Sequence, residues 1–573
     1  MTYEVVDNFA AGLDTRKSPI TAPAGSLTIL KNAMITPGGE IAKRRAFVHA
    51  YTVPNSFGLA ATATNLVVFY RSGFVMPDNP PEQTADGTIL ETSYGMSVIQ
   101  KGVPNNTSTI YQTDYDVFDG RIYLATASAG SPTNQHFWDD ENIPSGVMIA
   151  TEGHSKGYAI KAYQTKIYSV SSRYMYYSAI NRPEIWNAKT AALDDIPVTI
   201  LTAGYPARCT VAAASISKFK NGQFIMVSGA DANHSEANGF HRISSVNSPV
   251  NTFVLDEVDT TRTSVSQTDS KVLIDAAPDT GRGYNNLSVQ DSGGEAPVSL
   301  EVYYNKLALF MPQSTQVWAV DPDPLKNQYT QLLRGIGTKA RRSVLQYGSG
   351  DVLFLDSSGI RSLKAKDSSN SASVSDIGSP VDPTVRDLKL SKGESYVNGA
   401  IALLEPSIGR FWMCFRDEIL CLSYFPGPAI TAWSVLTVPF QIQHAVTCNG
   451  RIFFRDTANK IWVYGGAHGT TYDNSTVEVR MPYLNGKKPG HNKTYEAIDL
   501  TISGTWEVRV SYDFNNPESE EVLGTFTAST WNSFKSELQG YASHVSFRFY
   551  NTVTGDAKLS NFAVHYQIAD DEQ

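Results

Sequence analysis

The chain has 573 residues, a formal net charge of −9 and 18% charged residues. Hydrophobic residues make up 42% of it and aromatic residues 11%, so a large core is available. Because a protein grips nucleic acid electrostatically with clustered Lys and Arg, the negative balance argues against tight nucleic-acid binding as the main role. The opening residues lack the basic and apolar parts of a secretory signal, and no run approaches the roughly 18 apolar residues of a membrane span, so we expect neither feature.

Pairs of short β-strands joined by tight turns recur along the chain. The clearest copies lie at 166–177, 350–363 and 449–464, where Val, Ile, Phe, Tyr and Trp flank turns of Gly, Asn or Asp. These turn residues accept the positive φ that a tight hairpin requires. One segment, 381–388, suggests a short helix.

The spacing of the hairpins indicates a repeat. Apart from one gap of 140 residues, successive hairpin centres are 40 to 60 residues apart, close to the roughly 40–50 residues of a four-stranded propeller blade. One hairpin cannot bury both faces, and blades that stack against one another can. We therefore predict a β-propeller of six or seven blades, with its first part at 51–200 and its second at 291–475. The centres are Val68, Ile122, Ile167, Leu307, Val352, Trp412 and Ile452.

The long gap between Ile167 and Leu307 predicts an inserted module at 201–290. Three short strands separated by Gly-containing turns, at 222–229, 238–243 and 251–255, favour a small β-barrel. The module resembles the FCCH-type barrel, the first catalytic cysteine half-domain of ubiquitin-activating enzymes, which also has counterparts in phage tail proteins. No catalytic cysteine is implied.

The last hundred residues have a different pattern. Apolar and polar residues alternate at 506–512, 545–549 and 559–566, as expected for an antiparallel sheet with one wet face. We predict a C-terminal β-sandwich at 476–573 and an extended N-terminal arm at 1–50. The fold class is therefore all-β: a propeller with an inserted barrel and a C-terminal sandwich.

Two acidic segments are candidate ion sites or turns. Asp114, Asp116 and Asp119 could offer carboxylate oxygens to a hard cation, but the spacing is not that of an EF-hand loop. The alternative is that Asp119 simply makes the turn before the strand at 121–124. The run at 321–324, Asp-Pro-Asp-Pro, reads as a rigid turn because each Pro restricts its neighbours.

The residues that could support catalysis are few and scattered. Glycoside hydrolysis needs two carboxylates that face one bond, and the pairs Asp139/Asp140 and Glu405/Asp417 could be such carboxylates or solvated turn residues. No Cys or His shows metal-ligand spacing. We therefore predict no enzyme activity, no catalytic, cofactor-binding or metal-binding residue, and no cofactor. Two histidines near Gly-rich turns, His468 and His491, could be metal ligands only as isolated residues. The four cysteines are Cys209, Cys414, Cys421 and Cys448. We expect Cys414 and Cys421 to be small buried residues.

Two short basic clusters could meet phosphates. They are Lys43-Arg44-Arg45 and Lys339-Ala340-Arg341-Arg342. The alternative for both is a solvated face or a contact to an acidic partner.

The N-terminal segment contains an ordered set of glycines, a proline, an asparagine and a basic pair: Gly12, Pro19, Gly25, Asn32, Gly38, Gly39, Lys43 and Arg44. Its pattern resembles the opening of tail nozzle proteins of short-tailed phages, the family of tail tubular protein B and the P22-type stabilisation protein. Weaker similarities follow in the same order at 177–187, 305–310, 351–363, 376–382 and 423–434, so that the resemblance covers most of 8–475.

This resemblance implies a structural virion protein made in the host cytoplasm. Six copies would form a ring below the tail adaptor, retain the packaged genome and form the channel for DNA ejection. The implied partners are the adaptor, tail fibre or spike proteins and, transiently and without sequence preference, the double-stranded genome. The alternative is a glycan-binding or glycan-cleaving propeller of a phage tail. A propeller scaffold of eukaryotic type is disfavoured because WD and kelch signatures are missing.

Overall fold

The computed structural model describes residues 2–63, 65–71, 88–91, 96–103, 110–128, 130–132, 136–138, 149–150, 157–186, 195–275, 282–289, 294–348, 350–365, 372–531 and 537–568. The chain divides into two compact units, Met1–Lys101 with Thr338–Gln573, and Gly102–Gly337. Strands dominate the described residues, and the α-helices among them are α1 (Asp382–Lys392) and α2 (Glu394–Asn398). Neither helix has the length and apolar character of a membrane span.

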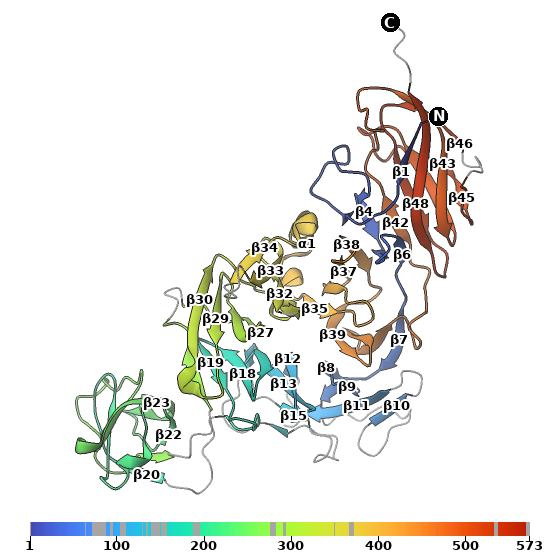
Figure 1. Cartoon of the computed structure of the whole chain (residues 1–573). Helices are drawn as coiled ribbons and strands as arrows, with labels where there is room; N and C mark the ends of the chain where they lie inside the picture. Colours follow the sequence, from blue (N-terminus) through green and yellow to red (C-terminus); the bar gives the residue numbers. More distant parts are fainter. Residues whose placement is uncertain are drawn as a thin grey trace. The chain divides into compact units, whose positions relative to one another are not determined.

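Four-stranded antiparallel sheets, seven of them within the described residues, form a β-propeller (Figure 1). The first unit holds blades one, five, six and seven. Blade one consists of β8 (Ser56–Ala61), β9 (Asn65–Arg71), β10 (Thr88–Glu91) and β11 (Met96–Val103), and blade five of β31 (Leu345–Tyr347), β32 (Asp351–Asp356), β33 (Gly359–Ala365) and β34 (Ala372–Ser375). Blade six consists of β35 (Ile401–Leu404), β36 (Phe411–Cys414), β37 (Glu418–Phe425) and β38 (Ile430–Thr437), and blade seven of β39 (Ile442–Cys448), β40 (Arg451–Asp456), β41 (Lys460–Tyr464) and β7 (Phe47–Thr52).

The second unit holds blades two, three and four. Blade two consists of β12 (Ile110–Phe118), β13 (Arg121–Ser128), β15 (His136–Trp138) and β16 (Ile149–Ala150), with the short β14 (Ser131–Pro132) beside β13. Blade three consists of β17 (Ala159–Tyr163), β18 (Lys166–Ser171), β19 (Tyr174–Tyr177) and β26 (Gly283–Asn286). Blade four consists of β27 (Ser299–Tyr303), β28 (Lys306–Phe310), β29 (Ser314–Ala319) and β30 (Gln328–Arg334).

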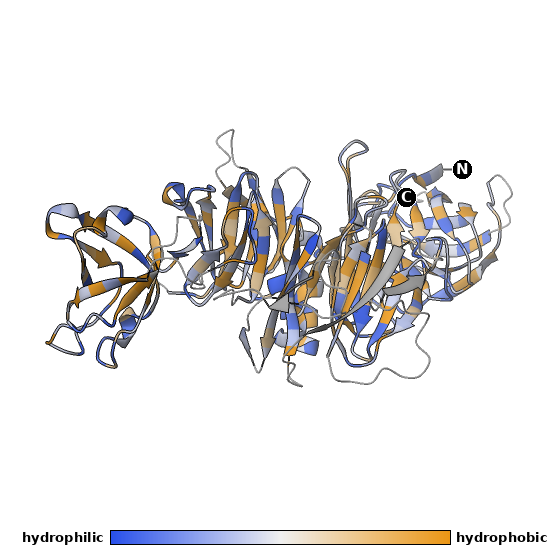
Figure 2. Cartoon of the chain, turned by 90° about the horizontal axis from the view of Figure 1, so that it is seen from below, coloured by the Kyte–Doolittle hydropathy of each residue, from blue (hydrophilic) through white to orange (hydrophobic). Residues whose placement is uncertain are grey.

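The predicted repeat is confirmed blade by blade. Each of the seven hairpin centres lies on the second strand of its blade and is at most 2% exposed. The turn between β39 and β40 shows why the hairpin signal was readable: Asn449 and Gly450 have φ of 45° and 70°, the left-handed values that a two-residue turn needs. Figure 2 shows the resulting alternation of hydrophobic and hydrophilic residues along many strands.

The inserted module is a closed six-stranded barrel. It lies between β19 and β26 of the third blade, so the insertion runs from Asp195 to Asp275 and is shorter than the predicted 201–290. The barrel core is apolar, with Phe253 and Leu255 fully buried. The strands are β20 (Asp195–Leu201), β21 (Arg208–Val211), β22 (Phe224–Ser228), β23 (Gly239–Asn247), β24 (Thr252–Leu255) and β25 (Leu273–Asp275).

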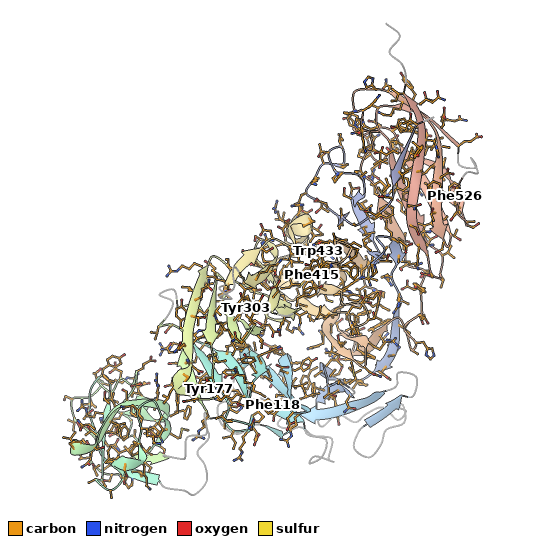
Figure 3. All side chains as sticks on the ribbon, viewed as in Figure 1. Phe118, Tyr177, Tyr303, Phe415, Trp433 and Phe526 are labelled. Atoms are coloured by element: carbon orange, nitrogen blue, oxygen red, sulfur yellow. The ribbon has the colours of Figure 1, made fainter. Side chains whose placement is uncertain are left out.

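Aromatic rings attach the barrel to the blade that carries it. The Phe224 ring of β22 lies 5.1 Å from the Tyr284 ring of β26 and 6.2 Å from the Tyr177 ring of β19. Phe240 stacks on Phe224 at 5.4 Å. Edge-to-face and offset contacts of this kind add to apolar burial, so the barrel is packed onto its blade rather than only tethered to it. Tyr177 is labelled in Figure 3.

The C-terminal residues form the predicted sandwich, but the N-terminal residues help to build it. One sheet runs β46 (Glu537–Ala542), β43 (Lys493–Ser503), β48 (Lys558–Ile568), β6 (Ile41–Lys43) and β5 (Ala33–Ile35), and β1 (Thr2–Val6) also pairs with β48. The other sheet runs β4 (Ile29–Lys31), β42 (Val477–Arg480), β47 (Ser546–Asn551), β44 (Trp506–Ser511) and β45 (Glu521–Phe526).

The expected extended arm at 1–50 is therefore replaced by sheet structure. β4 also meets β38, so that the second sandwich sheet continues into the sixth blade. Trp433 of β38 is fully buried in the core shared by this blade and the sandwich (Figure 3). The arm looked irregular in sequence because its strands before β7 are only two to five residues long, and β1, β4 and β6 pair with residues hundreds of positions away.

The segment that suggested a short helix is helical. α1 begins at Asp382 and extends to Lys392, with Pro383 in its first turn, where the missing N–H costs nothing. Val385 and Leu388 face the core.

A glycine of the N-terminal segment packs closely against the sixth blade. In β2 (Gly12–Leu13), which pairs with β3 (Ser26–Leu27), Gly12 has φ of 59°. A Cβ at this position would lie 2.6 Å from Ala432 Cβ. We expect Gly12→Ala to lower stability by about 2–4 kcal/mol through left-handed strain and overpacking. Thermal melting of the full chain measures the loss.

The matched control is Gly427→Ala, because a Cβ at Gly427 meets nothing within 4 Å and its φ is not positive. An equal fall in melting temperature for both variants would contradict the packing argument.

Candidate functional site

The acidic cluster on β12 connects two blades. Asp114 accepts hydrogen bonds from the N–H of Tyr115 at 2.9 Å and of Ile160 at 3.0 Å. Asp116 accepts from the N–H of Ala162 at 2.7 Å. Since Ile160 and Ala162 belong to β17 of the next blade, the two carboxylates bind backbone donors instead of standing ready for a cation. Asp119 makes the β12–β13 turn, at φ of 49°, as the alternative interpretation predicted.

Lys161 extends this cluster to a third blade. Its Nζ lies 2.7 Å from Glu301 Oε1 of β27 and 3.9 Å from Asp116 Oδ2. First strands of three consecutive blades thus share one ionic network. Lys161 thus has an acidic partner on each of the two neighbouring blades. Because a charge left unpaired away from water is costly, this arrangement opposes the sliding of one blade past the next.

The buried position shifts the proton affinities of the network. Burial, assisted by the charge of Asp116, raises the pKa of Asp114 to about 7, although two backbone N–H groups oppose the shift. Burial also raises the pKa of the Glu301 carboxyl, against the attraction of Lys161. Burial alone would lower the pKa of Lys161, but Glu301 and Asp116 outweigh it and the pKa rises.

The described carboxylate pair has no geometry for glycoside hydrolysis. Glu405 precedes β36 and pairs with Arg410 at 3.1 Å, whereas Asp417 follows β36 and accepts from Lys392 Nζ at 2.8 Å. The two groups therefore lie at opposite ends of a strand, and they cannot face one bond. Asp139 and Asp140 lie outside the described residues.

Two of the three side chains of the first basic cluster are structural, those of Lys43 and Arg44. Lys43 is 2% exposed and donates to Asn551 Oδ1 at 2.9 Å and to the Val553 carbonyl at 2.7 Å. Arg44, also 2% exposed, donates to Asp473 Oδ2 at 2.9 Å. The hypothesis that these two side chains meet phosphates is wrong, because both are buried and bound within the protein.

The second basic cluster is also engaged by protein groups. Lys339 Nζ lies 3.0 Å from Glu394 Oε1, and Arg342 donates to the Gln443 carbonyl at 2.7 Å. The Asp-Pro-Asp-Pro run is the predicted turn: Asp321 accepts from the Asp323 N–H, and Asp323 in turn from the Leu325 N–H.

The candidate ligand residues do not come together in a metal site. His468 and His491 are exposed, and no group of three His, Cys, Asp or Glu side chains that could hold a metal occurs in the described residues. The four cysteines are buried and unbonded to each other, as predicted for Cys414 and Cys421.

Sequence reasoning missed the role of Asn32, which lies between β4 and β5. Its Oδ1 accepts from the Thr437 N–H at 2.8 Å and from Arg44 Nε at 3.2 Å, and its Nδ2 donates to the Thr476 carbonyl at 2.8 Å. One amide therefore ties the N-terminal segment to the sixth blade and to the start of the sandwich. The residue type was the only signal in the sequence: Asn tolerates a left-handed φ, here 57°, better than most residues.

Comparisons with known proteins concern the fold. No protein-family model and no curated protein matches the chain. Among solved structures, BamB from Moraxella catarrhalis has 10% identity and a TM-score of 0.33 and covers 74% of this chain and 97% of its own. The WD40 domain of Pan2 from Neurospora crassa has 8% identity and a TM-score of 0.27, with 62% and 95% covered. Likenesses this distant carry nothing about binding or activity.

The blade network predicts a pH dependence. Because the pKa of Asp114 is about 7 in the folded chain against 3.8 for the ordinary group, the folded state holds a proton that the unfolded state has released between these pH values. The contribution of Asp114 to stability therefore falls as the pH rises from about 4 to 7. The Asp114→Asn side chain cannot ionise. We therefore expect the melting temperature of this variant to rise relative to that of the wild type as the pH goes from about 4 to 7, and the difference between the two to stay constant outside this range.

The matched control is Asp119→Asn, on the exposed turn of the same hairpin. Its melting temperature should follow the wild-type pH profile throughout. If Asp114→Asn follows that profile too, the carboxyl does not titrate in this range.

Removal of the central cation tests the ionic network directly. Lys161→Met leaves Glu301 buried without its partner, and we expect a loss of about 2–3 kcal/mol, at the lower end for a pair that is partly exposed. Adding Glu301→Gln should restore most of the loss, which chemical denaturation of single and double variants can measure. Additive losses in the double variant would contradict the pairing.

Proposed function

We propose that this chain is a subunit of the ring-shaped tail nozzle of a short-tailed phage. In this role six copies dock below the tail adaptor, retain the packaged genome and form the channel through which DNA leaves. The protein is then a structural virion component without enzymatic activity, made in the host cytoplasm, and its neighbours are the adaptor and the tail fibres or spikes.

The observation that supports this proposal most is the use of the N-terminal pattern in the fold. Three residues that match the nozzle pattern, Gly12, Asn32 and Lys43, have specific structural roles. Gly12 makes room for Ala432, Asn32 binds Thr437 and Thr476, and Lys43 binds Asn551. Gly12 and Asn32 hold the N-terminal segment against the sixth blade, Asn32 also reaches the start of the sandwich, and Lys43 binds within the sandwich. Residues of the resemblance therefore lie where this chain packs its N-terminal segment, which supports the proposal.

The charge is compatible with a channel through which DNA must slide. Each phosphate–cation contact adds affinity and salt dependence, so a wall that holds phosphates tightly would retard ejection. Six chains of formal charge −9 carry −54. In the two basic clusters, Lys43, Arg44, Lys339 and Arg342 bind protein groups, which favours weak and transient contact with DNA.

Electron microscopy of virions that carry an epitope at the C-terminus of this chain tests the proposal. We expect six antibody labels in a ring at the distal tail. The same epitope on the adaptor serves as the control and should label a ring nearer the capsid. Labels on peripheral fibres or spikes, or a number other than six, would contradict the hexameric nozzle.

A further inference from the structure

Two open edges bound the sandwich sheet that contains β43 and β48. β46 ends the sheet on one side, and β1, which pairs with β48, ends it on the other (Figure 1). Among the residues that the structure describes, no backbone hydrogen bond joins β1 or β46 to anything but its one neighbour in the sheet. Such an edge offers a row of N–H and C=O groups to a further strand.

An exposed aromatic ring lies at each of these edges, on the same face of the sheet. Tyr3 of β1 and Tyr541 of β46 are each 65% exposed. Each is three residues from a side chain of its own strand that faces the core, Val6 or Leu538, so both rings lie on the opposite, outer face. Neither strand contains the lysine or proline that commonly protects an edge. Both edges are therefore suited to pairing with another strand.

The two edges match in direction and in length. Adjacent strands of this sheet are antiparallel, so β1 of one copy and β46 of a second copy placed beside it would be antiparallel too. Outer-facing side chains must then meet outer-facing ones. Under that condition, the register that pairs Tyr3 with Tyr541 is the one that keeps all of Thr2–Val6 opposite residues of β46.

The side chains also fit in this register. On the core side Val6 meets Leu538, so the apolar core continues from one copy to the next. Glu4 meets Gly540, which has no side chain, and keeps the hydrogen bond that its carboxylate accepts from the Gly486 N–H at 3.0 Å. A shift by two residues would place Glu4 against Leu538 instead. On the outer side the two tyrosine rings cover one another, and aromatic pairs are favourable cross-strand contacts.

The partner is a second copy of this chain, because both halves of the contact lie on one chain. A contact between two different patches of the same chain is heterologous, and when it is repeated by rotation it closes into a ring. We propose that β1 of each subunit pairs with β46 of the next, with Tyr3 opposite Tyr541, and that the sandwich sheet thereby continues from subunit to subunit. The pairing rests on the two edges, whereas a ring of six rests on the proposed nozzle function.

Cysteine cross-linking of the full chain tests the pairing. Residues that face one another across antiparallel strands have Cα atoms about 4.5–5.5 Å apart, a separation that a disulfide spans. Mild oxidation of Tyr3→Cys/Tyr541→Cys, as purified chain and in virions, should therefore give a ladder of disulfide-linked oligomers. A mixture of the two single variants should stop at dimers. The native cysteines are buried, so they do not compete.

Two further double variants serve as controls. Tyr3→Cys/Tyr205→Cys is the matched control, because Tyr205 is also 65% exposed but lies in the barrel. Its yield of linked oligomers should be lower by about fivefold or more, since its cysteines are not held at disulfide distance. Tyr3→Cys/Gln539→Cys tests the register and should also link less. All four positions are exposed, so substitution removes no core packing, and melting temperatures check that the variants fold.

Three outcomes would overturn the proposal. The first is a Tyr3→Cys/Tyr541→Cys yield no higher than that of the Tyr205 control in both preparations. The second is equally efficient linking of Tyr3→Cys or Tyr541→Cys alone, which would mean that like edges pair about a two-fold axis. The third is a higher yield for the Gln539 variant, which would mean a different register.

The nozzle role and the edge pairing fail separately. Six epitope labels at the distal tail without a cysteine ladder would leave the nozzle proposal standing and remove the edge pairing. A ladder from the purified chain, with labels on peripheral fibres, would do the reverse.

Discussion

The fold of the first unit depends on pairing the beginning of the chain with its end. A β-sheet edge that ends without a partner leaves a row of N–H and C=O groups open to misassembly. Here β7 supplies the fourth strand of the last blade through pairs such as Phe47 with Tyr464. β1 and β6 pair with β48 in the sandwich. The first 52 residues therefore complete two different sheets, and neither is whole without them.

The same constraint explains where polar groups are buried. Short strands that join distant segments have few backbone hydrogen bonds of their own, and side chains supply the rest. Asn32 and Lys43 serve this purpose in the first unit, while Asp114, Asp116 and Lys161 serve it between blades of the second. A buried ionic group stabilises little when it is paired, but it penalises any arrangement in which the partner is missing. These residues therefore contribute less to the free energy of unfolding than to the choice of one arrangement of the segments over its alternatives.

Surface chemistry is separated from these structural contacts. The Asp cluster and the basic clusters looked functional in sequence. In the structure their side chains bind groups of the protein itself. The outer face of the sandwich, in contrast, keeps exposed rings such as Tyr3 and Tyr541. The nozzle role is a proposal that rests on the N-terminal segment and on the charge of the chain.

Local patterns in the sequence determined the all-β class, the hairpins, the blade repeat, the inserted barrel and the sandwich alternation, because turn residues and period-2 burial act over a few residues. The turn at Asn449 and Gly450 and the alternation after Trp506 are examples. Tertiary structure alone decided that the N-terminal arm enters the sandwich, that Lys43 is buried, that Asp114 binds the next blade, and that Glu405 and Asp417 lie apart. These depend on contacts between residues tens to hundreds of positions apart, and residue type does not reveal such a partner. An Asp within or beside a strand has the same local pattern whether it faces a cation, water or the backbone of a neighbouring blade.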